Sequence, residues 1–398
     1  MASSSSSSQG KHSLPRNVWI LGLVSLFNDI ASEMIYPIVP IFLTRTLGAS
    51  AAIVGIIEGI AEATASVLKV FSGWLSDRFR HRKKFVIAGY ALSALAKLVL
   101  SLASIWWHVL GARFIDRFGK GTRTAARDAL IADSTAEHQR GAAFGMHRAM
   151  DTLGAIIGPL LALALLHFLG ERFTLIFLLA FFPGLLALGL LFWGVKEPPR
   201  RSDIQRLTFR LSLQQFTRPF KHFLLVSLVF ALGNSSDAFL ILRAQSMGYT
   251  TTQTVFLYVL FNLFFAGLAY PIGRLSDRLG ARRVLLGSFF FFGTIYLGFA
   301  LASGPRLLIA LFPLYGIYMA MSEGISKAYI TQIVPENIRA TALGTYYTLT
   351  GLITFFASSL AGLMWHYLDV RAPFYFGAGM AFLAGILFLP AYGRKTRD

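Results

Sequence analysis

Acidic side chains recur at helical spacing within two long apolar stretches near the start of this 398-residue chain. Asp29 and Glu33 stand four residues apart in the first stretch, and Glu58 and Glu62 stand four apart in the second. Residues at this spacing share one face of an α-helix. Because a carboxyl group in an apolar setting can bind and release a proton near neutral pH, these four acids are candidates for proton transfer.

A stripe of cations occupies a later apolar stretch. Arg113, Arg117, Lys120 and Arg127 follow one another at spacings of four, three and seven residues, which places them along one helix face. Charges inside apolar stretches normally face a cavity or a partner of opposite sign. We therefore expect the four acids and this stripe to form a paired network. Arg113 is the expected partner of the acids, and Arg117 is an expected contact for a substrate.

The second half of the chain offers four further candidates for contact with a substrate. Asn234 and Asp237 stand in one apolar stretch, and Glu323 and Lys327 stand four apart in another, where we expect an intrahelical ion pair. The eight histidines have no ligand spacing and the chain has no cysteine, so we expect no metal site. The sequence also has no catalytic cluster, and we expect neither enzymatic activity nor a cofactor.

Long apolar blocks must position these residues. The chain is 55% hydrophobic and 14% charged, whereas soluble domains carry about 25% charged residues. A helix of about 20 apolar residues crosses a hydrocarbon core of about 30 Å. We predict an all-α integral membrane protein with about twelve transmembrane helices, at residues 18–43, 52–75, 85–104, 106–132, 145–169, 174–195, 223–243, 254–275, 284–302, 307–333, 342–367 and 374–392.

The basic residues predict how these helices are oriented. The net charge is +18, but most of the cations stand in the links after the second, sixth and eighth predicted helices and at the C-terminus. This distribution indicates positive-inside orientation rather than nucleic-acid binding. We expect both termini and the middle link to be cytoplasmic, in a multi-pass protein of the inner membrane. We expect a monomer whose partners are lipids and a small-molecule substrate.

The chain divides into two related halves. A disordered tail (1–17) precedes a six-helix bundle (18–195), and a proline-containing link (196–221) leads to a second bundle (222–392) and a short tail (393–398). The segment that begins at Gly73 returns at Gly273, displaced by 200 residues, and a second echo is displaced by 199. Two matches at nearly one displacement predict an internal repeat, which in transporters places the substrate site between the halves.

The repeated segments resemble a known family. The run from Gly273 to Arg283 closely resembles the loop motif of the major facilitator superfamily, although the first copy has Arg80 where that motif has glycine. The fifth predicted helix carries a motif similar to that of exporting antiporters in this superfamily. Arg113 stands where proton-coupled members often keep an arginine. The antiporter-like motif consists of Gly154, Gly158 and Pro159.

The loop motif has a physical interpretation. A carboxylate next to arginines at a helix end can accept charge-assisted hydrogen bonds, and such a contact can hold one conformation and break in the other. We therefore predict that the duplicated motif is a conformational latch. Its residues are Gly73, Asp77 and Arg78 in the first half and Gly273, Asp277 and Arg278 in the second.

The resemblance implies a secondary transporter that works by alternating access, with the proton gradient as energy source. We expect antiport in the direction of efflux, with drugs, sugars or metabolites as substrates. Two alternatives stay open at this point. The basic stripe on the fourth predicted helix is also compatible with a carrier of anionic solutes, such as carboxylates or their metal chelates. A membrane sensor that transports nothing is the third, less favoured hypothesis.

Overall fold

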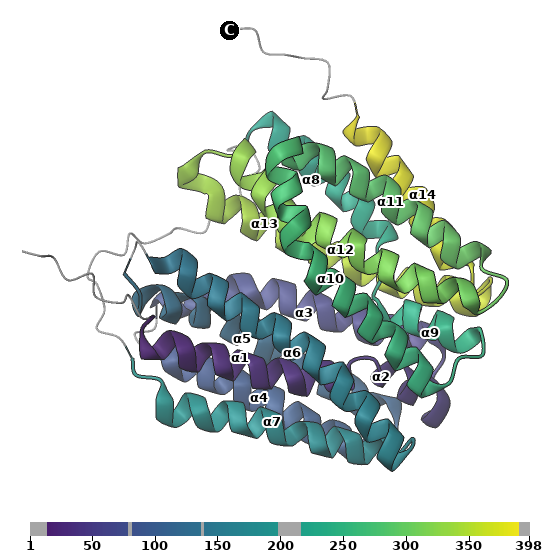
Figure 1. Cartoon of the computed structure of the whole chain (residues 1–398), viewed down its shortest axis with the longest axis horizontal. Coiled ribbons are helices and arrows are strands. Elements are labelled where there is room, and N and C mark those ends of the chain that lie inside the picture. Colours follow the sequence, from purple (N-terminus) through teal and green to yellow (C-terminus); the bar gives the residue numbers. More distant parts are fainter. Residues whose placement is uncertain (1–13, 79–81, 137–138, 198–215, 390–398) are drawn as a thin grey trace, which may run out of the picture.

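The computed structural model describes residues 14–78, 82–136, 139–197 and 216–389, which contain helices and no strand. Figure 1 shows the helices running side by side. In chain order they are α1 (Arg16–Ile35), α2 (Val39–Ile41), the π-helical turn η1 (Phe42–Thr46), α3 (Ala51–Arg78), α4 (Arg82–Ser101), α5 (Trp106–Asp133), α6 (Arg140–Leu169), α7 (Phe173–Gly194), α8 (Arg218–Gly233), α9 (Ala238–Ser246), α10 (Thr251–Leu279), α11 (Ala281–Leu301), α12 (Arg306–Ile333), the short 3-10 turn η4 (Glu336–Ile338), α13 (Arg339–Tyr367) and α14 (Ala372–Phe388).

Twelve crossings of a membrane account for these helices. Within the described residues, ten helical segments are long and apolar enough to span a membrane, and α14 is a shorter apolar helix. The remaining crossing is α5, whose sequence carries eight charged residues. Helix α5 packs against α3 and α4, so its charges meet protein partners rather than lipid. The predicted fold class of about twelve membrane helices in two bundles is confirmed.

The two halves repeat one packing pattern. In the first half α1 packs on α6 and α7, α5 packs on α3 and α4, and α4 packs on α7. In the second half α8 packs on α13 and α14, α12 packs on α10 and α11, and α11 packs on α14. These sets match when α1 corresponds to α8 and each later helix follows in order. Between the halves α3 packs on α13, and α6 packs on α10. Since α3 corresponds to α10 and α6 to α13, each of these contacts is the counterpart of the other, as a pseudo-twofold axis requires.

The first crossing of each half is broken, which corrects the prediction of continuous helices at 18–43 and 223–243. Helix α1 ends at Ile35, and a turn at residues 36–38 precedes α2. Pro37 and Pro40 lack backbone donors, and proline clashes with the preceding helical turn. Helix α8 ends at Gly233, and residues 234–237 are not helical before α9 begins. Asn, Ser and Asp compete with the helix for backbone hydrogen bonds, which explains the second break.

Six helices begin at the same end of the bundle, each at or next to an arginine, and we call this end the basic end. The helices α1, α4, α6, α8, α11 and α13 begin there with Arg16, Arg82, Arg140, Arg218, Arg282 and Arg339. Helix α8 starts four residues before the predicted second bundle. Thr217 accepts a hydrogen bond from the Phe220 amide, and Pro219 is tolerated in a first helical turn. Pro219, which was predicted to lie in the link, therefore lies in the first turn of the helix.

The apolar core joins the two halves at the end opposite the basic end. There Phe42 and Leu43 belong to the same buried cluster as Leu240 and Ile241 of α9, and α2 packs on α9. Thr251 of α10 also donates a hydrogen bond to Glu171, in the turn between α6 and α7. Near the basic end the first half has a separate buried cluster of its own. The halves are thus held together at the opposite end.

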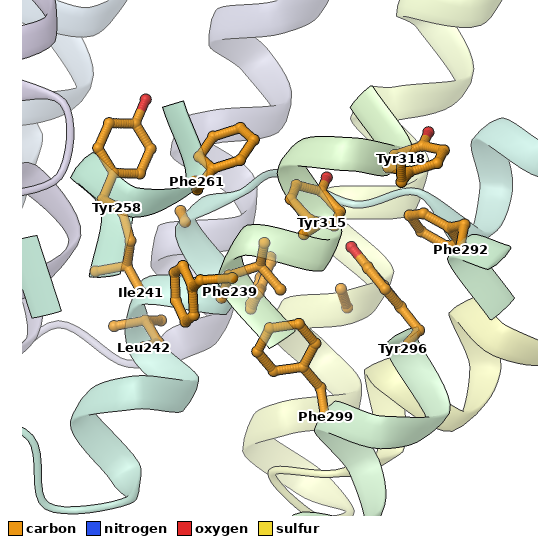
Figure 2. Packing of buried hydrophobic residues seen from close by; sticks show 14 of the residues in the cluster. Phe239, Ile241, Leu242, Tyr258, Phe261, Phe292, Tyr296, Phe299, Tyr315 and Tyr318 are labelled. Carbon is orange, nitrogen blue, oxygen red and sulfur yellow. The ribbon is translucent and has the colours of Figure 1, made fainter. Parts of the chain in front are cut away.

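Aromatic rings fill much of the second half. Figure 2 shows Phe292, Tyr296, Tyr315 and Tyr318 gathered in its interior. The rings of Phe292 and Tyr296 stack with centroids 3.9 Å apart, and Tyr318 meets Phe292 edge-on at 4.7 Å. Such pairs add roughly 0.5–1.5 kcal/mol each beyond the burial of their area. The interior of the second half is accordingly filled by packed aromatic rings, whereas the first half carries a network of charged side chains.

Candidate functional site

An ion pair between α3 and α5 lies at the centre of the site. The Arg113 guanidinium donates from Nε to Glu58 Oε1 at 3.0 Å and from Nη2 to Glu58 Oε2 at 2.7 Å. The side chains are only 5% and 2% exposed. A bidentate pair of this kind fixes direction as well as distance. Arg113 also lies over the Tyr36 ring, 5.5 Å from its centroid. Arg113 was expected to pair with the acids, and in the structure its partner is Glu58.

The break between α8 and α9 brings the second half to this pair. Ser236 lies in that break, and its hydroxyl donates to Glu58 Oε2 at 3.4 Å. The Ser236 amide donates to the Ser358 hydroxyl of α13 at 3.1 Å. The Glu58 carboxylate therefore accepts hydrogen bonds from both halves of the chain.

Glu33 makes a second contact between the halves. Tyr258 of α10 donates from its hydroxyl to Glu33 Oε2 at 3.0 Å, and the Tyr258 ring lies 5.6 Å from the Tyr36 ring. Asp29, one turn earlier on α1, accepts from the Asn28 amide group at 3.3 Å. Within the described residues neither Asp29 nor Glu33 has an ion pair. The prediction that all four acids pair with the basic stripe is therefore wrong for these two.

The next charged groups along the stripe, Arg117 and Lys120, are not fully paired by the described residues. Arg117 Nη2 meets Glu62 Oε1 at 3.2 Å, while Arg117 Nε is buried without a hydrogen-bond partner in the described chain. The Glu62 side chain is 39% exposed. Lys120 is exposed and makes no ion pair with a described residue. Because a charge in mid-membrane avoids lipid, we infer that Glu62 and Lys120 face water between the halves.

Arg127 of the stripe and two other charged residues of α5, Asp116 and Arg123, have structural partners. Lys97 of α4 pairs with Asp116 at 3.4 Å, and Arg127 pairs with its neighbour Asp128 at 2.9 Å. The Arg123 guanidinium lies over the Tyr90 ring at 4.5 Å. These contacts explain how a helix as charged as α5 stays inside the bundle.

The antiporter-like motif lies directly beside the acids of α1. A Cβ atom on Gly154 would stand 2.8 Å from the Asp29 Cβ, and one on Gly158 would stand 2.9 Å from the Glu33 Cβ. Only glycine permits helices α1 and α6 to approach this closely. Pro159 is buried next to Gly158, inside α6. The motif thus sets the separation of the two helices at the level of Asp29 and Glu33.

The second-half candidates lie in different surroundings. Asp237 accepts a hydrogen bond from the Tyr315 hydroxyl at 2.7 Å, and Asn234 Oδ1 is buried at the end of α8 without a partner among the described residues. Glu323 does not pair with Lys327 as predicted. It pairs at 3.3 Å with Arg148 of α6, in the other half, while the Lys327 ammonium lies 5.7 Å from the Tyr347 ring centre. The spacing of four residues permits a Glu323–Lys327 pair, but the packing of α6 on the second half places Arg148 closer to Glu323.

The loop motif of the second half lies in the last turns of α10. Asp277 and Arg278 are exposed, and Asp277 has no ion pair within the described residues. Gly273 has open space where a Cβ would stand. Gly280 ends the helix with φ of 89°, a conformation that favours glycine. In the first half Gly73, Asp77 and Arg78 lie in the last turns of α3, but their side chains are outside the described residues.

The contacts that join the halves were not predicted from the sequence. Tyr36, Ser236, Tyr258 and Arg148 were not predicted to touch the acids. One signal was present, because Pro37 in the first crossing and the polar run after Gly233 in the seventh occupy corresponding helices. Interrupted helices at corresponding positions of two repeats point to a binding site.

The fold and this site together define a class of protein. Two six-helix bundles repeat one packing pattern, meet along two helix pairs, and enclose charged residues between them. This is the architecture of a membrane transporter built from parallel repeats.

Comparison with known proteins identifies the family. The chain matches the sequence profile of the Major Facilitator Superfamily over residues 21–305 and 225–398. It is 40% identical over 382 residues to an uncharacterised MFS-type transporter of Methanocaldococcus jannaschii, covering 94% of this chain and 95% of that protein. The chain therefore belongs to the Major Facilitator Superfamily and is a multi-pass membrane transporter.

Two further similarities bear on fold and function. The multidrug resistance protein MdtH of Aeromonas hydrophila is 25% identical over 335 residues, which is 82% of each chain. A solved POT family transporter in complex with 5-aminolevulinic acid has a TM-score of 0.80 at 14% identity, covering 96% of this chain and 97% of that one. The second similarity concerns the fold alone.

Proposed function

We propose that this chain is a proton-coupled secondary transporter that exports small solutes by alternating access. The observation that carries the proposal is that Glu33 and Glu58 each accept a hydrogen bond from the opposite half, from Tyr258 and Ser236 respectively. Protonating either carboxyl group changes the contact between the halves, and parting the halves changes the surroundings of the carboxyl group. A proton and a conformational change are coupled when each alters the free energy of the other.

The conformation described here fits one step of such a cycle. The halves are joined at the opposite end, whereas Glu62 and Lys120 are open to solvent. Glu33 and Glu58 act as acceptors, the role of an ionised carboxylate. In an exporter this state receives the solute, and later protonation of the carboxylates accompanies its release on the other side.

The direction and location rest on further arguments. Export is supported by the antiporter-like motif Gly154–Pro159 and by the similarity to a protein named for multidrug resistance. We place the basic end in the cytoplasm of a cell with an inner membrane, by the positive-inside rule. We further propose a monomer that needs no cofactor and uses the proton gradient as its energy source.

Transport by the full chain in liposomes tests the proposal. The probes are ethidium, a lipophilic cation, and citrate, each with and without an imposed pH gradient. We expect the gradient to drive ethidium flux in the wild type. Glu33→Gln should abolish this driven flux yet retain ethidium exchange without a gradient. Asp369→Asn, at an exposed carboxylate in the turn between α13 and α14, is the control and should retain both. Ethidium flux that ignores the gradient in the wild type would contradict proton coupling.

A carrier of anionic solutes is the second candidate function. It is supported by two cationic groups that could bind an anion. These are the exposed Lys120 and the Arg117 guanidinium, whose buried Nε has no partner among the described residues. In this case citrate rather than ethidium should be transported, and Lys120→Gln should weaken citrate transport. Citrate transport that is insensitive to Lys120→Gln would remove the support for this candidate.

A further inference from the structure

A buried polar cluster lies between α1, α5 and α6, on the basic-end side of Asp29, and the proposed export cycle makes no use of it. Its members on α6 are His147 and Asp151, which stand one helical turn apart. His147 Nδ1 lies 3.7 Å from Asp151 Oδ2, and the residue is only 4% exposed. The other ring nitrogen, Nε2, is buried and has no hydrogen-bond partner among the described residues. The ring therefore has capacity for one more polar ligand.

Neutral groups complete the surroundings of Asp151. The Ser25 hydroxyl of α1 donates to Asp151 Oδ1, and Arg127 Nη1 donates in turn to the Ser25 hydroxyl at 3.4 Å. Arg127 itself makes its ion pair with Asp128. Among the described residues Arg127 thus reaches Asp151 through Ser25, and Asp151 itself contacts a hydroxyl and an imidazole.

This cluster continues the line of acids along α1. Ser25 and Asp29 stand four residues apart on one face of α1. Asp151 stands three residues from Gly154, whose Cβ position would be 2.8 Å from the Asp29 Cβ. From the centre towards the basic end, the titratable groups follow as Glu33, Asp29, Asp151 and His147. Successive groups are about one helical turn, or roughly 5.4 Å, apart along the helix axes.

We propose that Asp151 and His147 form a second proton-binding site, which carries the proton between Asp29 and the basic end. The proposal rests on the proposed proton coupling. The O–H bond of a protonated Asp29 breaks as the Asp151 carboxylate gains the proton. Asp151 then passes the proton to Nδ1 of a neutral His147 ring that carries a proton on Nε2. The imidazolium releases the Nε2 proton to water that enters from the basic end, and the neutral ring left behind carries its proton on Nδ1. Rotation of the ring or exchange with that water restores the proton on Nε2, so one proton has moved per cycle and no oxidant or reductant takes part.

The charged groups that act on His147 come from α5 and α6. Besides Asp151, the charged groups that act on it are Arg127 and Asp128 of α5 and Arg148 of α6 itself. Helix α1 contributes the Ser25 hydroxyl and Asp29, and α7 has no titratable side chain. Helix α10 carries Arg274, Asp277 and Arg278 near the basic end, and none of them makes an ion pair with His147. Two cations and two carboxylates thus surround the ring, so adding or removing one proton does not leave an isolated charge.

The test uses His147→Gln and Asp151→Asn in the full chain reconstituted in liposomes. Glutamine keeps a hydrogen-bonding group but cannot carry the proton, and asparagine keeps the shape of Asp151. The transported probe is whichever of ethidium and citrate the wild type moves. Gradient-driven flux should fall by about tenfold or more in both variants, because general acid–base groups typically contribute at least that factor to proton transfer. Exchange without a gradient and the thermal midpoint should stay close to those of the wild type.

A matched control and two contrary results complete the design. His167→Gln changes an exposed histidine at the other end of α6 and should alter neither activity. The relay would be overturned if the two variants kept wild-type gradient-driven flux. It would also be overturned if they lost flux, exchange and thermal stability together. In both cases the proposal of proton coupling would stand. A wild type without gradient-driven flux would overturn both proposals. The response of the wild type therefore distinguishes failure of the relay from failure of the proposed function.

Discussion

Glu33 accepts a hydrogen bond from Tyr258 at 3.0 Å, although the two residues are 225 positions apart and belong to opposite halves of the chain. The contact lies between the first crossing of one half and the second crossing of the other. It can exist only while these helices are close. The hydrogen bond of Tyr258 therefore depends on how the halves are arranged, and its partner Glu33 is a candidate proton carrier.

Replacing this tyrosine should favour separation of the halves. Tyr258→Phe removes a hydrogen bond worth about 1 kcal/mol, which corresponds to a roughly fivefold change in the conformational equilibrium. The chain has no cysteine, so a Glu171→Cys, Thr251→Cys pair reports closure at the opposite end without background. We expect slower disulfide formation in the Tyr258→Phe background. Tyr249→Phe, whose hydroxyl bonds to Pro305 within the second half, is the control, and equal rates in both would contradict the prediction.

The Arg113–Glu58 pair should contribute strongly to the stability of the conformation described here. Glu58→Gln or Arg113→Gln leaves one buried charge without its partner, at a cost of about 3–5 kcal/mol. The double variant should cost less than the sum of the single variants, because no buried charge remains unpaired. Thermal unfolding in detergent measures these differences. Arg45→Gln breaks a largely exposed pair with Glu171 at 3.7 Å and should cost about 1 kcal/mol or less. Strict additivity at Arg113 and Glu58 would contradict this account.

The glycines of α6 should not tolerate a side chain. A Cβ atom at residue 154 would stand 2.8 Å from the Leu26 carbonyl oxygen, and one at residue 158 would stand 2.8 Å from the Ile30 carbonyl oxygen. Because these are backbone atoms, Gly154→Ala and Gly158→Ala should each destabilise the chain by about 1–3 kcal/mol. Gly145→Ala, on the same helix with open space at its Cβ position, should be neutral. Yield and unfolding temperature measure the effect, and three equivalent variants would disprove it.

The latch role of Asp277 predicts a change in rate without a change in stability. The carboxylate is exposed and makes no ion pair within the described residues, so Asp277→Asn should alter stability by no more than about 0.5 kcal/mol. If the carboxylate holds a different conformation of the cycle, the turnover rate should still fall. Transport assays on Asp277→Asn and Asp77→Asn measure this. Wild-type turnover in both would leave the motif with only a role in membrane orientation.

Much of the architecture could be predicted from local sequence. The apolar blocks located the crossings to within a few residues, and the displacement between Gly73 and Gly273 indicated two repeated bundles. The breaks at Pro37 and after Gly233 could have been predicted from the same kind of signal. They were missed because their flanking residues are apolar enough to read as one continuous block.

The partners of the charged residues were harder to predict. Helical spacing placed Glu58 and Glu62 on one face and Arg113 and Arg117 on another, and these faces do meet. The same rule failed for Glu323, which pairs with Arg148 across the halves rather than with Lys327. Spacing states which residues share a helix face, but it does not state which helix that face meets.

By itself the sequence determined the membrane helices, the two-bundle repeat and the faces on which charges gather, because each depends on residues close together in the chain. Only the tertiary structure decided that Glu33 meets Tyr258, that Ser236 reaches Glu58, and that α6 comes close enough to α1 to place Asp151 near Asp29. Those pairings depend on the rotation and separation of helices that are distant in sequence. Packing of small residues such as Gly154 and Gly158 sets that separation, and rotating a helix by one residue, about 100°, would give each acid a different neighbour.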